Sequence, residues 1–186
     1  MAILISVPLL IAGVLSLVLA FMFIRMEKHT ELTNSVFWLG IFACFWCLGY
    51  ALMGLSSFEL APFHRGVGAV AVHGYCLAFC CFFTLAANLD YSAKTKRAIL
   101  VFLVLFSVVD SVLYGQAKNV SFSMVNGRVC YFPVQTPERI VHYVYLAVCV
   151  SYLYFTGLFW WRKAKLRREK RLITAILVSG IVMIVC

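Results

Sequence analysis

Three ionisable side chains, His73, Asp110 and His142, interrupt the long apolar segments of this sequence, and Arg139 directly precedes one of these segments. An ionisable group inside a lipid bilayer is costly, so each of them is a candidate functional residue. With a helical rise of about 1.5 Å per residue, both histidines and the aspartate are expected in the outer third of a membrane. This shared depth predicts one polar pocket that faces outward. Three tyrosines are candidates for its aromatic walls: Tyr75, Tyr143 and Tyr145.

The same residues allow simpler interpretations. Each could lie separately at the membrane interface, or could form a single hydrogen bond to a neighbouring helix. His73 and His142 could also be a pair of haem ligands, although no second pair occurs toward the inner side. Because histidine titrates near neutral pH, the pair could make the pocket sensitive to pH. We expect neither a metal nor a cofactor in this chain.

Enzyme motifs do not accompany these residues. The sequence has no H-E-x-x-H, no G-x-S-x-G, no phosphate-binding loop, no dinucleotide fingerprint and no kinase signature. Asp110 is the single carboxylate clearly embedded in an apolar run, so an aspartate dyad for intramembrane proteolysis has no second member. We therefore expect no catalytic activity in this chain.

Eight cysteines raise the question of metal or redox chemistry. Six lie inside apolar runs, where free cysteine packs as a small hydrophobe: Cys44, Cys47, Cys76, Cys80, Cys81 and Cys149. Cys44 and Cys47 form a C-x-x-C, but neither a second pair nor a histidine follows at the spacing of a zinc site. We interpret these six as packing residues. Cys130, in an expected external loop, is the one cysteine to test for redox chemistry.

The elements that must position these side chains are transmembrane helices. Of the 186 residues, 64% are hydrophobic and 12% charged, against roughly 45–50% and 25% in soluble domains. A chain of this size cannot hide that excess in one soluble core. Because a helix needs about 20 residues to cross a bilayer, the apolar runs predict an all-α polytopic membrane bundle. Six runs are visible, at residues 3–24, 36–55, 66–89, 98–114, 140–161 and 172–186.

Basic residues predict the orientation of the bundle. Twelve of the sixteen lysines and arginines lie in the first, third and fifth connections, seven of them between Arg162 and Arg171. The positive-inside rule therefore places the N-terminus outside. Because the basic residues sit in short gaps between apolar runs, the net charge of +9 does not indicate nucleic-acid binding. The expected partner is the lipid bilayer.

One external connection has a predicted structure of its own. Asn126-Gly127 separates two short segments with partial alternation, within residues 120–132. Such a dipeptide is a strong signal for a β-hairpin with a type I′ turn. We predict a small extracytoplasmic hairpin, with an irregular loop as the alternative. The last apolar run stops at Cys186 without a polar flank, so we expect the chain to end within a sixth helix.

Several loose motifs are spread along the chain. They are Phe37-Trp38 and Trp46-Cys-Leu-Gly-Tyr50-Ala-Leu in the second run, Arg65-Gly-x-Gly68, Gly74-Tyr75 and Leu89-Asp90-Tyr91 around the third, and Asn126-Gly-Arg128 to Arg139-x-x-His142. In these the sequence resembles the N-terminal seven-transmembrane region of bacterial histidine kinases, which also precedes diguanylate cyclases. The resemblance covers nearly the whole chain.

The resemblance implies a function in signal transduction. It implies seven helices in the bacterial inner membrane, followed by a cytoplasmic histidine kinase or diguanylate cyclase domain beyond Cys186. We therefore expect a sensor module that couples an extracytoplasmic or membrane signal, carried by an unidentified small molecule, to that domain. Such receptors commonly act as homodimers. A small-molecule or ion transporter is the alternative, and an intramembrane enzyme or haem protein is a third.

Overall fold

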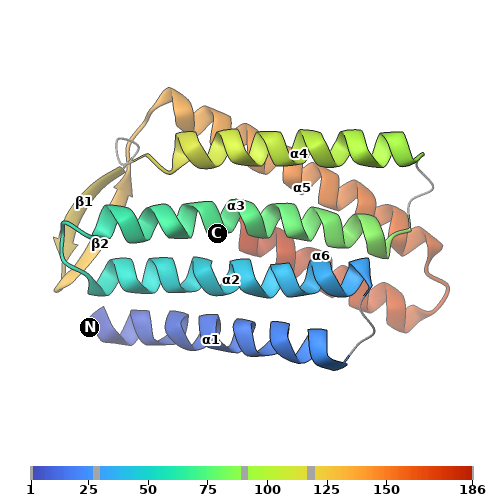
Figure 1. Cartoon of the computed structure of the whole chain (residues 1–186), viewed down its shortest axis with the longest axis horizontal. Coiled ribbons are helices and arrows are strands. Elements are labelled where there is room, and N and C mark those ends of the chain that lie inside the picture. Colours follow the sequence, from blue (N-terminus) through green and yellow to red (C-terminus); the bar gives the residue numbers. More distant parts are fainter. Residues whose placement is uncertain (1, 27–29, 89–91, 117–119, 186) are drawn as a thin grey trace.

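The computed structural model describes residues 2–26, 30–88, 92–116 and 120–185. These residues form a bundle of helices with one antiparallel hairpin at its end (Figure 1). The elements are α1 (Ala2–Met26), α2 (Glu31–Leu55), α3 (Ala61–Ala86), α4 (Ala93–Tyr114), β1 (Val120–Val125), β2 (Arg128–Pro133), α5 (Pro137–Lys163) and α6 (Arg167–Val185). The mostly helical class and the hairpin are confirmed. The described part of the chain contains six helices, which gives no support to a count of seven.

Five helices are long and apolar enough to cross a membrane. Their candidate spans are Ser6–Arg25, Glu31–Leu55, Ala61–Ala86, Lys94–Tyr114 and Pro137–Lys163. On the outer helices α1 and α4, large apolar side chains such as Leu19 and Leu105 are each 61% exposed. Exposed apolar surface on this scale is a liability in water but suits contact with lipid tails.

Four helices begin five residues before the apolar run that predicts them: α2, α3, α4 and α6. Capping side chains explain two of these starts. The Thr30 hydroxyl accepts a hydrogen bond from the backbone N–H of Thr33, and the Ser92 hydroxyl accepts one from Thr95, both at 3.1 Å. Caps satisfy the first free N–H groups of a helix. A helix can therefore start in polar sequence outside the hydrocarbon, where hydropathy gives no signal.

Helix α3 is the centre of the bundle. It packs against α2, α4 and α5, while α1 lies beyond α2 and α6 returns beside α5 (Figure 1). The main core lies between α3, α4 and α5 and contains Cys76, Phe79, Cys80, Phe83, Leu103, Tyr145, Cys149 and Leu153. Three of the cysteines assigned to packing therefore lie inside this core. The seven described cysteines are all free thiols.

The hairpin covers one end of the bundle. Val125 pairs with Arg128 across the turn, and both turn residues have positive φ, +52° at Asn126 and +75° at Gly127. Two positive φ angles are the requirement of a type I′ turn, which Asn-Gly meets at little cost. Val129 of β2 is 1% exposed and packs with Met53 and Ala61. The strands are thus anchored to the ends of α2 and α3.

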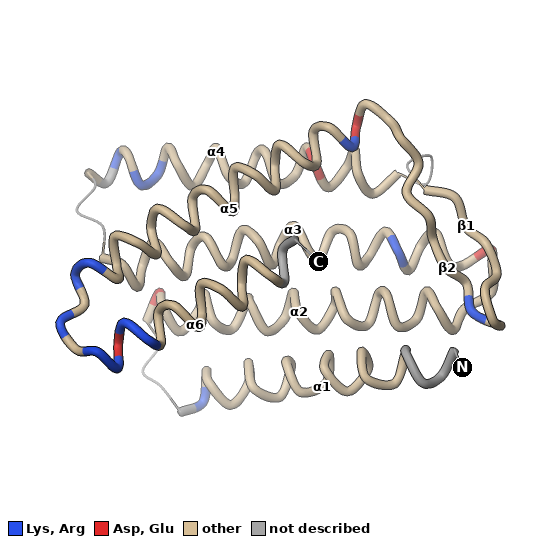
Figure 2. The backbone as a smooth tube through the Cα atoms, turned by 180° about the vertical axis from the view of Figure 1, so that it is seen from behind, with Lys and Arg blue, Asp and Glu red and all other residues tan. Residues whose placement is uncertain are grey.

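Charge is distributed unequally between the two ends of the bundle. Lysines and arginines gather at the end opposite the hairpin, around the α5–α6 connection and the start of α4 (Figure 2). Arg128 lies in β2, Arg139 lies in the first turn of α5, and Arg65 contacts Tyr131 of β2, so these three arginines lie at the hairpin end. Lys28, one of the twelve basic residues in the odd-numbered connections, and Lys118, one of the other four, lie outside the described residues. The Leu89-Asp90-Tyr91 motif also lies outside them.

Candidate functional site

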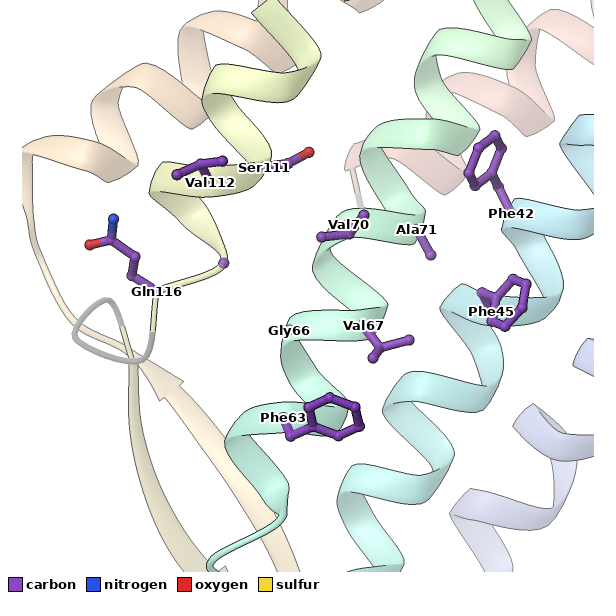
Figure 3. Close-up of a pocket in the computed structure, with 11 residues that line it drawn as sticks. Phe42, Phe45, Phe63, Gly66, Val67, Val70, Ala71, Ser111, Val112 and Gln116 are labelled. Carbon is purple, nitrogen blue, oxygen red and sulfur yellow. The ribbon is translucent and has the colours of Figure 1, made fainter.

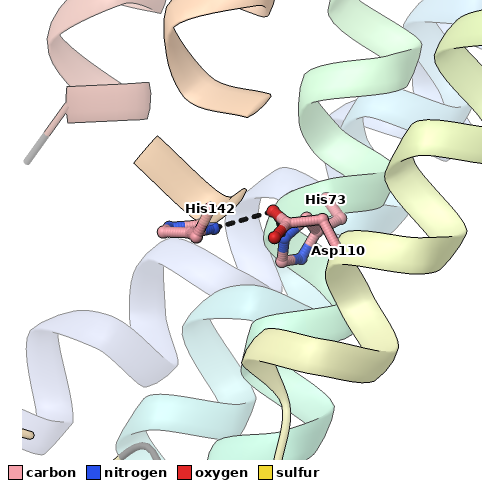
Figure 4. Close-up of side chains that lie close together, drawn as sticks. All are labelled: His73, Asp110 and His142. Atoms are coloured by element: carbon pink, nitrogen blue, oxygen red, sulfur yellow. Dashed lines mark hydrogen bonds and ion pairs between the residues drawn. The ribbon is translucent and has the colours of Figure 1, made fainter. Parts of the chain in front are cut away.

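Three of the predicted site residues meet at one atom. The Nε2 atom of His73 lies 2.7 Å from Oδ2 of Asp110, and Nδ1 of His142 lies 2.8 Å from the same oxygen (Figure 4). His73 comes from α3, Asp110 from α4 and His142 from α5. His73 and Asp110 are fully buried, and His142 is 8% exposed. This cluster, which we call the His–Asp–His triad, connects three helices through a single carboxylate.

The hydrogen bonds around His73 define its protonation. Its Nδ1 atom lies 2.5 Å from the carbonyl oxygen of Ala69, one turn earlier in α3. A carbonyl can only accept, so Nδ1 of His73 must be the donor. In a neutral ring Nε2 then carries a lone pair, which faces the acceptor oxygen of Asp110. A cation, either a proton or a metal ion, is therefore required between these two atoms.

Two tyrosines enclose the triad. The Tyr114 ring stacks on the His142 ring, with centroids 3.7 Å apart and planes 12° apart. The Tyr145 ring lies 5.1 Å from the ring of His73, and its hydroxyl donates to the His73 carbonyl at 3.3 Å. Tyr145 was predicted as an aromatic wall of the pocket; it packs against His73 in the buried core and is not among the residues that line the pocket. Tyr114 was not predicted, although its place one turn after Asp110 puts it on the same helical face.

Arg65 is a second residue that sequence reasoning missed. It is fully buried on α3, and its Nη1 donates at 2.9 Å to the carbonyl of Tyr114, at the end of α4. Its guanidinium stacks over the Tyr114 ring at 4.7 Å and over the Tyr131 ring at 5.8 Å. Its Nε and Nη2 atoms are buried without a partner among the described residues. Arg65 therefore joins α3, α4 and the hairpin behind the triad.

Replacing Arg65 by lysine tests this arrangement. Lysine keeps the charge but loses the planar group that stacks on two rings. We expect the free energy of unfolding to fall by about 1 kcal/mol. Denaturation of the purified protein in detergent measures it, with the exposed Arg97→Lys as matched control. Equal stability of the two variants would show that the stacking contributes nothing.

A pocket of about 730 Å³ opens beside the triad, beneath the hairpin. His142 borders it, so the triad and the pocket share one side chain. The other polar and aromatic lining residues come from α2, α4, β2 and α5: Trp46, Tyr50, Tyr114, Arg128, Tyr131, Arg139 and Tyr143. None of the described lining residues is acidic. The pocket therefore offers positive charge, hydroxyl groups and aromatic rings.

The remaining predicted residues fall into two groups. Arg139 and Tyr143 line the pocket and pair with each other, since the guanidinium hydrogen-bonds the phenol oxygen. Tyr75 lies elsewhere, packed against Trp46 and Phe79. It is two residues from His73, which at about 100° per residue places it on the opposite side of α3. Tyr75 is therefore not a wall of the pocket.

The geometry also bears on haem and redox chemistry. The Asp110 oxygen lies between His73 and His142, whose ring centroids are only 5.3 Å apart. A porphyrin held by both rings would have to occupy that same space, so the haem interpretation does not fit. Cys130 is a half-buried free thiol in the pocket lining. Its redox chemistry stays a prediction.

A second hollow lies on the side of the bundle. It measures about 620 Å³ and is lined from α2, α3 and the end of α4 (Figure 3). Its walls are mostly apolar and include Phe42, Phe45, Phe63, Val67 and Val70. Ser111 and Gln116 supply its few polar groups. This groove lacks charged side chains and is separate from the triad, so we take the hairpin-covered pocket as the candidate site.

No known family model and no curated protein match this chain. The resemblance to the membrane region of histidine kinases therefore stays a proposal. The site must be interpreted from its own chemistry. Its features are a buried triad that joins three helices and a cationic, aromatic pocket that touches one member of it.

Proposed function

We propose that this chain is the membrane-embedded input module of a signalling protein, and that it senses a small organic anion in the pocket beneath the hairpin. The observation that carries the proposal is the position of His142. This side chain borders the pocket and is hydrogen-bonded to Asp110, which also binds His73. A ligand that displaces His142 therefore acts on α3, α4 and α5 together.

The chemistry of the lining indicates the class of ligand. Arg128 and Arg139 both line the pocket, and the Nε atom of Arg128 is buried without a partner among the described residues. Arginine binds carboxylates through paired N–H groups, and tyrosine rings pack against flat apolar groups. An aromatic carboxylate combines the two features. The ligand would complete hydrogen bonds that the free protein leaves unmade.

The connection from α5 to α6 supplies a route to an output domain. Helix α5 extends from the pocket to Lys163 at the opposite end, and α6 begins at Arg167 and packs beside it. A ligand that prefers one arrangement of α5 shifts a pre-existing equilibrium toward it. The shift would be passed through α6 to a cytoplasmic histidine kinase or diguanylate cyclase domain, in a homodimer.

The proposed location follows from the charge distribution. The basic end of the bundle would face the cytoplasm and the hairpin end would face outward. That the membrane is the inner membrane of a bacterium is what the resemblance to histidine kinases implies. The pocket would then be open to extracytoplasmic ligands. Transport is the competing function. Transporters commonly bind substrate at broken helices near the midplane, whereas the described helices run without a break.

Benzoate is the probe that tests the pocket. Titrated into the protein in nanodiscs, it should bind saturably, while benzyl alcohol, which lacks the charge, should bind at least tenfold more weakly. Arg139→Gln should weaken benzoate binding by about 10- to 100-fold, because a charge-assisted hydrogen bond contributes roughly 1.5–3 kcal/mol. Arg97→Gln, at the opposite end, should leave binding unchanged. Equal binding of the acid and the alcohol would contradict an anion site.

A second measurement separates sensing from transport. Spin labels on α5 and α3, at the end away from the pocket, should show a change in separation when benzoate is added. Proteoliposomes that hold the same protein should show no benzoate uptake. Uptake at a rate that depends on Arg139 would overturn the sensor proposal in favour of a transporter.

A further inference from the structure

We propose that the His–Asp–His triad is a binding site for one divalent transition-metal ion of the zinc type. The ligands would be Nε2 of His73, Nδ1 of His142 and the carboxylate of Asp110. These donor atoms all lie within 4.8 Å of one another and come from three different helices (Figure 4). The sequence did not indicate a metal centre here, since the three residues are separated by 37 and 32 positions.

The protonation of His73 is the first argument. Because Nδ1 donates to the Ala69 carbonyl, Nε2 of a neutral His73 ring would point a lone pair at Oδ2 of Asp110, 2.7 Å away. Two acceptors at this distance repel each other unless a cation lies between them. A divalent ion that binds both atoms, after they separate to about 3.3 Å, leaves both histidines neutral, the form in which imidazole binds metals.

The unused oxygen of Asp110 is the second argument. Its Oδ1 atom is buried and has no hydrogen-bond partner among the described residues. A buried carboxylate oxygen without a partner is costly and requires an explanation. A metal ion at the triad could be bound by this oxygen, either alone or together with Oδ2.

The surroundings of His73 match those of a metal ligand. Histidines that bind metals usually donate their other ring N–H to a carbonyl or carboxylate, which fixes the tautomer and the ring orientation. The Ala69 carbonyl performs this function for His73. On the other side, Tyr114 stacks on His142 and restricts its rotation. Both rings are thus held with a donor nitrogen toward Asp110.

The donor set indicates the class of ion. Imidazole nitrogens suit zinc, copper, iron and nickel, whereas calcium and magnesium prefer oxygen ligands alone. Zinc–nitrogen bonds of about 2.0–2.1 Å in tetrahedral geometry require donors about 3.3 Å apart, so the outermost donors must approach by at most roughly 1.5 Å. His142, at the edge of the pocket, is the least buried of the three ligands. Three protein ligands leave a fourth position open on the pocket side.

Cobalt binding tests the proposal with a spectroscopic readout. The purified protein in nanodiscs is stripped with a chelator and titrated with Co²⁺. We expect one equivalent of Co²⁺ to produce visible ligand-field bands without thiolate charge-transfer bands, and Zn²⁺ to displace it. His142→Gln and Asp110→Asn should weaken binding by at least tenfold. His64→Gln, on α3 but outside the triad, should bind as the native protein does.

Two results would overturn the metal site. One is a folded native protein that retains no ion at micromolar Co²⁺ or Zn²⁺, which would leave a proton as the cation between His73 and Asp110. The other is cobalt with thiolate charge-transfer bands that disappear in Cys44→Ser/Cys47→Ser. If the triad variants do not fold, X-ray absorption of the zinc-loaded native protein decides the question. We expect two imidazoles in the first shell, and sulfur there would contradict the proposal.

This inference is independent of the anion-sensing proposal. Benzoate binding is measured in the presence of chelator and depends on Arg139, while cobalt binding is measured without benzoate and depends on His142 and Asp110. A failure of either experiment therefore leaves the other proposal intact.

Discussion

Asp110→Ala is expected to lower the free energy of unfolding by about 3–5 kcal/mol. The carboxylate is fully buried, and its Oδ2 atom lies 2.7 Å from Nε2 of His73 and 2.8 Å from Nδ1 of His142. Its removal leaves Nε2 of His73 and Nδ1 of His142 without this buried partner and breaks the polar contact that joins α3, α4 and α5. Chemical denaturation in detergent, with a chelator present, measures the loss without any contribution from a metal.

Two further variants serve as comparisons for the stability of Asp110→Ala. Ser111→Ala changes the neighbouring residue, whose hydroxyl donates only to the Ser107 carbonyl one turn earlier, and should cost no more than about 1 kcal/mol. Asp110→Asn keeps one acceptor oxygen and should lie between the two. If Asp110→Ala were no less stable than Ser111→Ala, the triad would not be holding the helices together.

Gly49→Ala should destabilise the bundle by about 2–3 kcal/mol, because α2 and α3 touch at this position. A Cβ atom on Gly49 would lie 2.6 Å from the backbone nitrogen of Gly68 and 3.0 Å from the carbonyl oxygen of His64. Both are backbone atoms, so no side chain can rotate away and α3 itself must move. Close approach of helix backbones at small residues is a common way to pack helices in membranes.

Gly66→Ala is the matched control on the same pair of helices. A Cβ atom there would meet nothing within 4 Å. Alanine favours the helix over glycine by up to about 1 kcal/mol, so this variant should be as stable as the native protein or slightly more stable. Thermal unfolding of both variants in one detergent gives the comparison. A Gly49→Ala protein as stable as Gly66→Ala would contradict the close crossing of α2 and α3.

Hydropathy and turn chemistry were sufficient to predict the secondary elements. Apolar runs identify helices because a bilayer requires about 20 apolar residues in each span. Asn126-Gly127 identifies the hairpin because both residues tolerate the positive φ that the turn needs. The starts of α2 and α4 were missed by five residues, since they depend on caps at Thr30 and Ser92 rather than on lipid contact.

The expected depth of each polar residue in the membrane was sufficient to predict which of them lie together in the site. His73, Asp110 and His142 were expected at one level because each position follows from the distance to a helix end. The angular position of each residue around its helix would have excluded Tyr75 from the predicted site, because Tyr75 lies about 200° around α3 from His73. It would also have included Tyr114, which lies four residues after Asp110 on the same face of α4. Arg65 gave no such signal, because the sequence suggested an interfacial arginine rather than a buried one.

The sequence by itself thus determined the helices, the hairpin and the level of the polar residues, since these depend on local composition and on the thickness of a bilayer. Only the tertiary structure decided that the two histidines share one oxygen of Asp110, that Arg65 is buried against Tyr114, and that the hairpin covers a cationic pocket. The rotation of each helix about its axis sets these contacts. That rotation follows from packing between helices such as the Gly49–Gly68 crossing, which involves residues far apart in the chain.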